Sequence, residues 1–487
     1  MQSRYILKIS FFLLTNSLCA ISFAEDDALF DHLSEANTLG YALTHGTFKG
    51  LLRYSGQYRG SNLHLLQDET STDTSNEKKQ QYSALGGYLG YETAPFFNTS
   101  IGATLYTSQP FGNNPDDRMG LGGLYESNGE QESYTVFGEA YIKFQYEDHL
   151  IKAGRQEMPD YRFVSLSDVR MTPITHEGAV YENTVFDHLK INLAYITKMK
   201  ERSAEKFIDM ATGARLKESS NGRQLIRGDY DQSDYDSSGY IGDKKEMSMV
   251  GLIYSTETFS VEGWNYYIND FLNTLYFYSQ YNMTPENSDL ALSLSAQYAN
   301  QSDVGDHIAG NIDTWFYGLK FQAVSQGITF FISYNEIDYN ENSYDGGSIF
   351  VRWGTPQMFN SFQVQDSELA GTRSIGTGVQ YQFGHNSIIP GVVMRLRYGD
   401  YDLPDKLSQS DARQDRTETT LDINYAFAKD ANVGDFSLNG LSVQFRVAYN
   451  DYDTGYDFDA YKDRHGYTSE SVTDDFIDTR LYLNYKF

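Results

Sequence analysis

The sequence predicts an all-β fold, a transmembrane antiparallel β-barrel of about 18 strands. Three observations predict it: apolar and polar residues alternate along many segments, aromatic residues make up 15% of the chain, and short and long connections alternate. Alternation with period two is the pattern of a strand whose two faces meet different surroundings. Connections of alternating length are typical of barrels with short turns on one side of a membrane and long loops on the other.

Composition excludes several other classes. The chain has 487 residues, with 38 Lys and Arg against 66 Asp and Glu, and a formal net charge of −28. Its hydrophobic content of 40% lies below the roughly 45–50% of a typical globular domain. The 40 Tyr and 30 Phe are too many for a disordered acidic chain. The negative charge argues against a nucleic-acid partner, which would need a basic face.

Residues 1–24 have the features of a secretory signal peptide. Arg4 and Lys8 precede an apolar run, and Ser22-Phe23-Ala24 is a small-x-small cleavage site. The only cysteine, Cys19, lies inside this segment, so disulfides cannot stabilise the exported chain. We expect residues 25–46 to form a periplasmic N-terminal segment and residues 47–487 to form the barrel.

Eighteen segments from Thr47 onward carry the alternation. In 441–449, for example, Leu441, Val443 and Phe445 alternate with Ser442 and Gln444. Apolar positions at i, i+2 and i+4 line one face of a strand but wrap around a helix, and Tyr, Phe, Val, Thr and Ile favour strands. The expected strands are 47–60, 82–91, 99–107, 134–146, 149–155, 178–185, 189–198, 247–255, 258–268, 272–281, 289–298, 313–323, 328–335, 373–383, 390–398, 417–427, 440–449 and 476–487.

The connections between these segments alternate in length, except that 269–271 is short where a long loop is due. An even number of strands places both chain ends on the side of the short turns. Because lipid offers no hydrogen bonds, a sheet within it must close on itself. A barrel of sixteen to eighteen strands leaves a water-filled lumen, so the architecture predicts a passage for solutes.

If the apolar faces meet lipid, the opposite parity faces the lumen and is rich in basic residues. One interpretation is a cationic wall that attracts anions or carboxylates. The other is that these residues neutralise inward acids such as Asp422 and Glu139. Arg395 and Arg397 form the sharpest pair, because positions i and i+2 share one wall. The inward basic positions are Arg53, Arg59, Lys143, Lys190, Lys320, Arg395, Arg397, Arg446, Arg480 and Lys486.

The connection 156–177 combines charges and hydroxyl groups. It would line a constriction if it folds inward, and would otherwise be a surface loop. Its candidate constriction residues are Arg162, Ser165, Ser167, Asp168, Arg170 and His176.

We expect no enzyme activity, no cofactor and no metal site. The nine histidines form no HExxH or paired spacing, and no GxSxG motif occurs. Asp451-Tyr452-Asp453-Thr454-Gly455 resembles the start of a calcium loop, but no Glu follows at the twelfth position. We therefore expect solvated outer loops at the acidic runs.

Several segments together resemble the OprD-type outer-membrane porins. They are Gly154-Arg155-Gln156-Glu157, Ser167-Asp168-Val169-Arg170-Met171-Thr172-Pro173, Glu177-Gly178-Ala179-Val180-Tyr181, 85–95, Trp353-Gly354-Thr355-Pro356, and Ile389-Pro390-Gly391 followed by Arg395-x-Arg397. The final Phe487 is similar to the aromatic end that such barrels present to the assembly machinery.

The resemblance implies an eighteen-stranded barrel whose third external loop, 156–177, folds into the lumen. It also implies a basic ladder on the wall, to which Arg395 and Arg397 correspond best, followed by Arg446 and Arg480. Members of the family pass amino acids, small peptides or aromatic carboxylates, and some relatives pass chitooligosaccharides. They are monomers or loose trimers in contact with outer-membrane lipid and lipopolysaccharide.

These observations predict a passive, partly selective channel of the bacterial outer membrane for small hydrophilic solutes, especially those with a carboxylate. One alternative is an oligosaccharide channel, in which inward aromatic rings stack on sugars. Phe137, Tyr141, Phe316 and Tyr482 would serve that purpose. The other alternative is a surface adhesin or antigen with a closed lumen.

Overall fold

The computed structural model describes residues 36–60, 80–112, 114, 123–127, 130–159, 161–214, 216–219, 222–225, 245–355, 357–365, 367–384, 387, 389–404, 415–429, 431–434, 436–452 and 475–487. The expected signal peptide, 1–24, and much of the acidic run that begins at Asp451 lie outside these ranges. Within them, no helix is both long and apolar enough to cross a bilayer.

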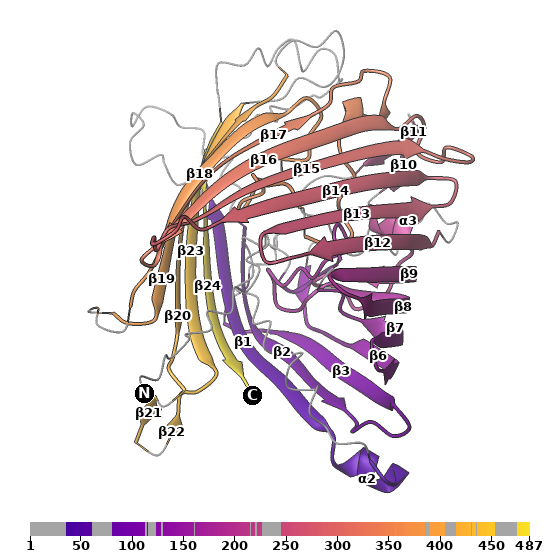
Figure 1. Ribbon diagram of the computed structural model, residues 1–487, viewed down its shortest axis with the longest axis vertical. Helices are drawn as coiled ribbons and strands as arrows, with labels where there is room; N and C mark the ends of the chain where they lie inside the picture. The colour runs from indigo at the N-terminus through magenta and orange to yellow at the C-terminus, as the bar shows by residue number, and fades with distance from the viewer. Residues whose placement is uncertain are drawn as a thin grey trace.

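Eighteen long strands form one closed antiparallel barrel (Figure 1). Each pairs with the next along the chain, and the last pairs with the first, which closes the ring. The strands are β1 (Thr47–Gly60), β2 (Gln80–Glu92), β3 (Thr99–Pro110), β6 (Tyr134–Tyr146), β7 (His149–Gln156), β8 (Thr175–Phe186), β9 (Leu189–Lys200), β12 (Met247–Ser255), β13 (Phe259–Ile268), β14 (Leu272–Met283), β15 (Ala291–Asp303), β16 (Asp313–Ser325), β17 (Ile328–Ile337), β18 (Arg373–Gln382), β19 (Val392–Asp402), β20 (Arg416–Ala426), β23 (Leu441–Tyr452) and β24 (Phe476–Lys486).

Short elements occupy the connections and the N-terminal segment. They are α2 (Leu39–Thr44), β4 (Tyr125–Ser127), β5 (Glu130–Glu132), α3 (Met210–Gly213), β10 (Leu216–Ser219), β11 (Gly222–Leu225), η2 (Tyr344–Gly347), β21 (Asn432–Val433) and β22 (Phe436–Ser437). Each of the eighteen expected segments coincides with one barrel strand. The predicted fold class and strand number are therefore confirmed.

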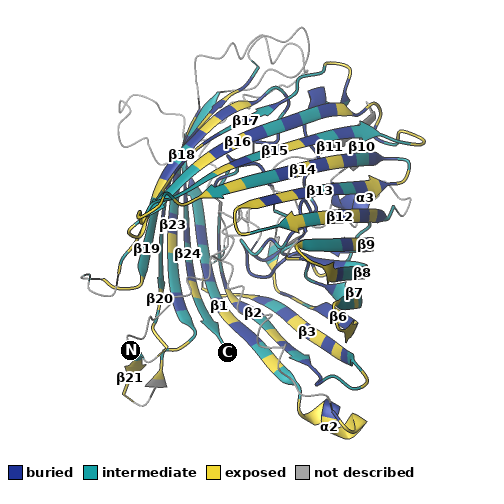
Figure 2. Cartoon of the chain, viewed as in Figure 1, coloured by how far each residue is buried: buried dark blue, intermediate teal, exposed yellow. Residues whose placement is uncertain are grey.

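Burial alternates along the strands, as Figure 2 shows. In β1, Leu52 is 51% exposed while Arg53, Ser55 and Gln57 are buried. The exposed positions carry large apolar side chains on strand after strand, among them Leu89, Phe277, Leu294 and Leu396. Strands expose this apolar face and cover the polar one, which is the arrangement of a barrel in lipid.

One side chain predicted to face inward faces outward. Phe137 is 54% exposed, whereas Glu139, which has the same parity, is buried. The register between β3 and β6 shifts between Thr104, opposite Glu139, and Leu105, opposite Phe137. This bulge skips Gly138 and reverses the alternation. A Cβ on Gly138 would lie 2.3 Å from the ring of Tyr106, so the bulge needs glycine at this position.

The ring closes along the seam between β24 and β1. Beyond the end of β24, the Phe487 amide donates to the Gly50 carbonyl at 3.0 Å, and the Gly50 amide donates to Phe487 at 2.8 Å. The Phe487 ring covers Gly50, where a Cβ would lie 2.2 Å from the ring. The final aromatic residue therefore belongs to the closing seam.

Among the connections opposite the short turns are loop 3 (157–174), loop 4 (201–246) and loop 7 (338–372). The structure describes each of these loops in part, and the contacts given below are those of the described residues. Loop 3 is shorter than the predicted connection, because β8 begins at Thr175. His176 is thus a strand residue. The connection 269–271 between β13 and β14 is short, as the sequence indicated.

Candidate functional site

Three arginines of the predicted ladder lie in one row across neighbouring strands. The row follows from pairing in register, since residues opposite one another share a face and a level. From β18 to β1, its members in order are Gln380, Arg395, Asp422, Arg446, Arg480 and Gln57.

Acids partly neutralise this row. Arg446 Nε lies 3.2 Å from Asp422 Oδ2, and Arg480 Nε lies 2.6 Å from Asp478 Oδ1. Arg59 also reaches Asp478, at 3.0 Å. The neutralising contacts of the second interpretation are therefore present for Arg446, Arg480 and Arg59. The attraction of anions by this wall stays a prediction.

Arg395 and Arg397 differ in their surroundings. Arg395 is half-buried and donates from Nε and Nη2 to Gln380 Oε1, at 2.9 and 2.6 Å. Arg397 is 1% exposed, and its guanidinium lies 4.8 Å from the centre of the Phe362 ring in loop 7. Lys320 on β16 is also buried, 5.1 Å from the Phe331 ring. Of these three bases, Arg395 is the most exposed.

The first half of loop 3 is bound to β13 through Arg162. Its Nε and Nη2 donate to Glu262 Oε2 and Oε1 at 2.9 and 2.5 Å, and its guanidinium lies 4.5 Å from the Tyr278 ring. Tyr266 donates to the Arg162 carbonyl at 2.7 Å. Burial alone would lower the pKa of Arg162, but the Glu262 carboxylate raises it above its usual value.

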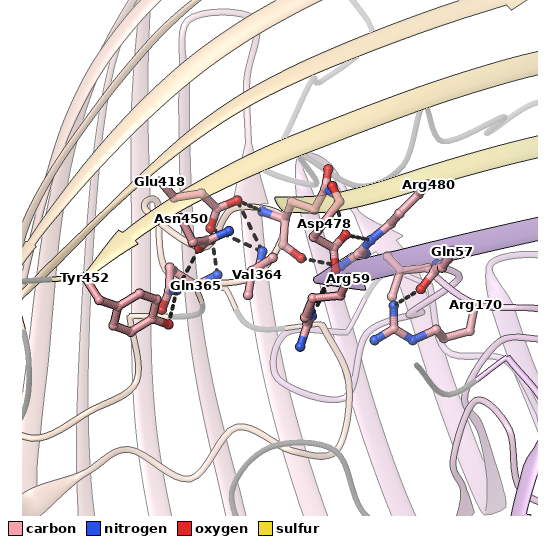
Figure 3. Close-up of polar contacts among 12 residues, drawn as sticks. Gln57, Arg59, Arg170, Val364, Gln365, Glu418, Asn450, Tyr452, Asp478 and Arg480 are labelled. Atoms are coloured by element: carbon pink, nitrogen blue, oxygen red, sulfur yellow. Dashed lines mark hydrogen bonds and ion pairs between the residues drawn. The ribbon is translucent and has the colours of Figure 1, made fainter. Parts of the chain in front are cut away.

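The second half of loop 3 is bound to β1 and β24. Arg53 donates to Asp168 Oδ1 and Oδ2 at 2.6 and 3.0 Å. Tyr482 donates to the Val169 carbonyl at 2.9 Å. Arg170 Nη1 donates to Gln57 Oε1 at 3.1 Å, as Figure 3 shows. In the ring order, β13 and β24 are half the ring apart.

Three further predicted residues have partners outside loop 3. Ser165 Oγ accepts from Gln357 of loop 7 at 2.7 Å, and Ser167 Oγ accepts from Arg202 of loop 4 at 3.3 Å. His176 Nε2 lies 2.9 Å from the Trp353 carbonyl. Two of these contacts are with loop 7 and one is with loop 4.

Arg170 is a buried cation among other cations. Burial, together with the positive charges of Arg480 and Arg202, lowers the pKa of the Arg170 guanidinium. Such a decrease means that the surroundings disfavour the charged form. An anion that approaches this group would relieve the repulsion.

Loop 7, for which no role was predicted, contacts a large part of the wall. The Glu418 carboxylate of β20 accepts the backbone N–H groups of Gln363, Val364 and Gln365, at distances of 2.8 to 3.2 Å (Figure 3). Gln363 also donates to Asp478 at 2.8 Å. The available signal was the pair Gln363 and Gln365, two residues apart and alternating with Phe362 and Val364.

Loops 3 and 7 contact each other closely at Gly354. A Cβ there would lie 2.5 Å from the Ser165 carbonyl oxygen. Gln357 accepts from Arg162 at 3.1 Å and donates to Ser165. The two loops are therefore one packed unit whose junction requires glycine.

No group of three or more His, Cys, Asp or Glu residues in the described part of the chain is arranged to hold a metal ion. Several charged side chains of the wall and loops bind one another, as Arg446 and Asp422 do.

A comparison with protein families decides the identity of the barrel. The model of the outer membrane porin, OprD family, matches residues 112–468. The chain belongs to the OprD family. This OprD-family porin is thus a member of a family of outer-membrane channels for small solutes, and these are not enzymes.

Several solved structures share the fold of this chain. OccK9 (OpdG) of Pseudomonas aeruginosa is 16% identical with a TM-score of 0.69, over 92% of this chain and 99% of that chain. OccAB3 of Acinetobacter baumannii is 15% identical with a TM-score of 0.68, over 91% and 99%. OpdK of Pseudomonas aeruginosa, solved with vanillate, is 17% identical with a TM-score of 0.64, over 91% and 98%. No curated protein matches the OprD-family porin.

Proposed function

We propose that this OprD-family porin selects small solutes that carry a carboxylate. The observation that supports the proposal is the row of Arg395, Arg446 and Arg480, which Gln57 connects to Arg170 of loop 3. Guanidinium groups bind carboxylates through charge-assisted hydrogen bonds. A solute carboxylate would meet half-buried Arg395 on the wall and relieve the repulsion around Arg170.

In this proposal, loop 3 lies inside the lumen and narrows the passage. The supporting contacts are those of Arg162 with β13 and of Asp168 with β1, on strands that are far apart in the ring. A segment bound at both places must run between them. Loop 7 would form the other wall of the constriction, since it contacts Ser165 and covers Arg397.

The four aromatic residues named for the oligosaccharide alternative either face outward or contact other parts of the protein. Phe137 faces outward, and Phe316 packs 6.4 Å from Phe163 of loop 3, centre to centre. Tyr141 donates to Glu92, and Tyr482 binds loop 3. The vanillate in the OpdK structure carries a carboxylate on an aromatic ring, which fits the carboxylate proposal better than a sugar.

The test compares glucuronate with glucose, which share a pyranose ring and differ in the carboxylate at C6. Liposome swelling with the purified protein should be faster for glucuronate than for glucose. Arg395→Gln combined with Arg170→Gln should reduce that ratio. Arg373→Gln is the matched control, because Arg373 is exposed on β18 and binds Glu336. Faster swelling with glucose, or an unchanged ratio in the double variant, would overturn the proposal.

We further propose that residues 1–24 direct export, that Phe487 is read by the barrel-assembly machinery, and that lipid and lipopolysaccharide surround the barrel. Exposed apolar side chains occur on many of the barrel strands, and we propose that the chain is a monomer or a loose trimer in that lipid. Export of a reporter fused to residues 1–24, and its failure without Arg4 and Lys8, would test the first of these.

A further inference from the structure

A short helix before the first barrel strand carries exposed apolar side chains. Helix α2 begins after Thr38, whose side chain accepts from the Tyr41 amide at 3.1 Å. Leu39 is 57% exposed and Leu43 is 53% exposed. These two positions are one turn apart, so they share one face of the helix.

The helix is held against the outer side of the wall. Tyr91 on β2 shares its face with Leu85 and Leu89, which are exposed outward. Tyr91 Oη donates to the Leu43 carbonyl and accepts from the Gly46 amide, both at 2.9 Å. An outward-facing residue thus fixes the end of α2, which places the helix beside the barrel wall rather than across its opening.

The turn between β2 and β3 completes the attachment. The Ala36 amide donates to the Pro95 carbonyl at 2.8 Å, and the Ala94 amide donates to the Ala42 carbonyl at 3.1 Å. Ala36, Ala42 and Ala94 are buried together, with Phe96 beside them. Figure 1 shows α2 at the lower right, next to the end of β3.

The apolar surface of α2 is continuous with the lipid-facing belt of the barrel. Phe48 is 67% exposed at the start of β1, with its ring 4.6 Å from that of Tyr91, and Phe97 of the adjoining turn is 73% exposed. The chain carries no Asp, Glu, Lys or Arg in 36–48 or in 93–98, although such residues make up 21% of it. A surface in contact with water would carry more charge.

We propose that α2 and the 93–98 turn lie in the headgroup region of the periplasmic leaflet, with Leu39, Leu43 and Phe97 inserted among the lipids. Aromatic residues gather at the interfaces of such barrels, and apolar helix faces bury themselves at the boundary between headgroups and acyl chains. In this proposal the 36–46 segment lies at the membrane interface beside the first strands, and it does not extend freely into the periplasm.

Single cysteines can test this, because the only native cysteine, Cys19, lies in the expected signal peptide. Leu39→Cys, Leu43→Cys and Phe97→Cys would each carry an environment-sensitive fluorophore in full-length protein reconstituted in vesicles. Leu52→Cys on the lipid-facing side of β1 is the positive control. Val433→Cys is the matched negative control, since it is 68% exposed on a turn with Lys429, Asp430 and Asp435 close in sequence.

Phospholipids brominated near the headgroup should quench the labels at positions 39, 43 and 97 and leave the label at 433 bright. A water-soluble quencher should instead quench the label at 433 and leave the labels at 39, 43 and 97 bright. Equal behaviour of positions 39, 43 and 433 would overturn the proposal. Protection of the labels at 39 and 43 from the water-soluble quencher only at a high protein-to-lipid ratio is a further possible result. That result would also overturn the proposal, and it would assign the surface to a second copy of the chain.

Discussion

The contact between Arg162 and Glu262 is the sharpest test of how loop 3 is held. We predict that Arg162→Met releases the first half of the loop from β13. Both side chains are at most 10% exposed, so the substitution leaves the Glu262 carboxylate buried without its guanidinium partner. Removing one partner of a buried ion pair costs about 3–5 kcal/mol.

This cost sets the expected change in loop population. A tenfold change in an equilibrium corresponds to about 1.4 kcal/mol. The released form of loop 3 should therefore become about 10²-fold to several thousandfold more populated relative to the bound form. If loop 3 narrows the passage, single-channel recordings should show a larger mean conductance and more frequent current fluctuations than the wild type.

Two further variants separate this effect from a general loss of structure. Arg162→Met with Glu262→Leu should restore quiet recordings, because an apolar pair of similar volume can replace a buried ion pair at little cost. Arg155→Gln breaks a pair with Glu177 in which both side chains are far more exposed, at 36% and 28%; such a pair is worth about 0–1 kcal/mol. Unchanged conductance and fluctuations in a folded Arg162→Met barrel would refute the reasoning.

Three other predictions concern loop 7 and the barrel seam. Glu418→Gln leaves one acceptor oxygen for three backbone N–H groups. Loop 7 should therefore become cleavable by added protease, while the barrel keeps its heat-dependent gel mobility. Unchanged resistance of loop 7 to the protease would contradict this. Gly354→Val should separate loops 3 and 7 and raise conductance, whereas Gly384→Val, where a Cβ meets nothing within 4 Å, should behave as wild type. Gly50→Leu should displace the Phe487 ring and lower the yield of folded barrel in detergent refolding; a normal yield would show that the seam tolerates a side chain there.

The strands could be predicted because their pattern is local. Each of them shows its two faces within about ten residues, as Leu441 to Tyr449 do, and the lipid outside demands an apolar side chain at every second position. The bulge at Gly138 was missed because its cause, the Tyr106 ring, comes from a different strand. Parity counting assumes an unbroken strand, and one extra residue reverses it.

The polar contacts of the site could be predicted only in part. Parity placed Arg446 and Asp422 on one wall, and their pairing followed. The contact of Arg162 with Glu262 joins residues 100 positions apart, and that of Gln363 with Asp478 joins residues 115 apart. No periodicity indicates such partners. The contacts of loop 7 could not be predicted for the same reason. Its polar residues are typical of a solvated loop, and only the fold places Glu418 opposite them.

The central claim is that the basic wall decides which solutes pass, although the chain as a whole carries a net charge of −28. The most direct measurement is the reversal potential of the purified protein in a planar bilayer under a potassium chloride gradient. We expect a potential displaced toward the chloride equilibrium value, and a smaller displacement after Arg395→Gln with Arg170→Gln. A potential displaced toward the potassium value would contradict it, because the acidic groups would then govern the passage.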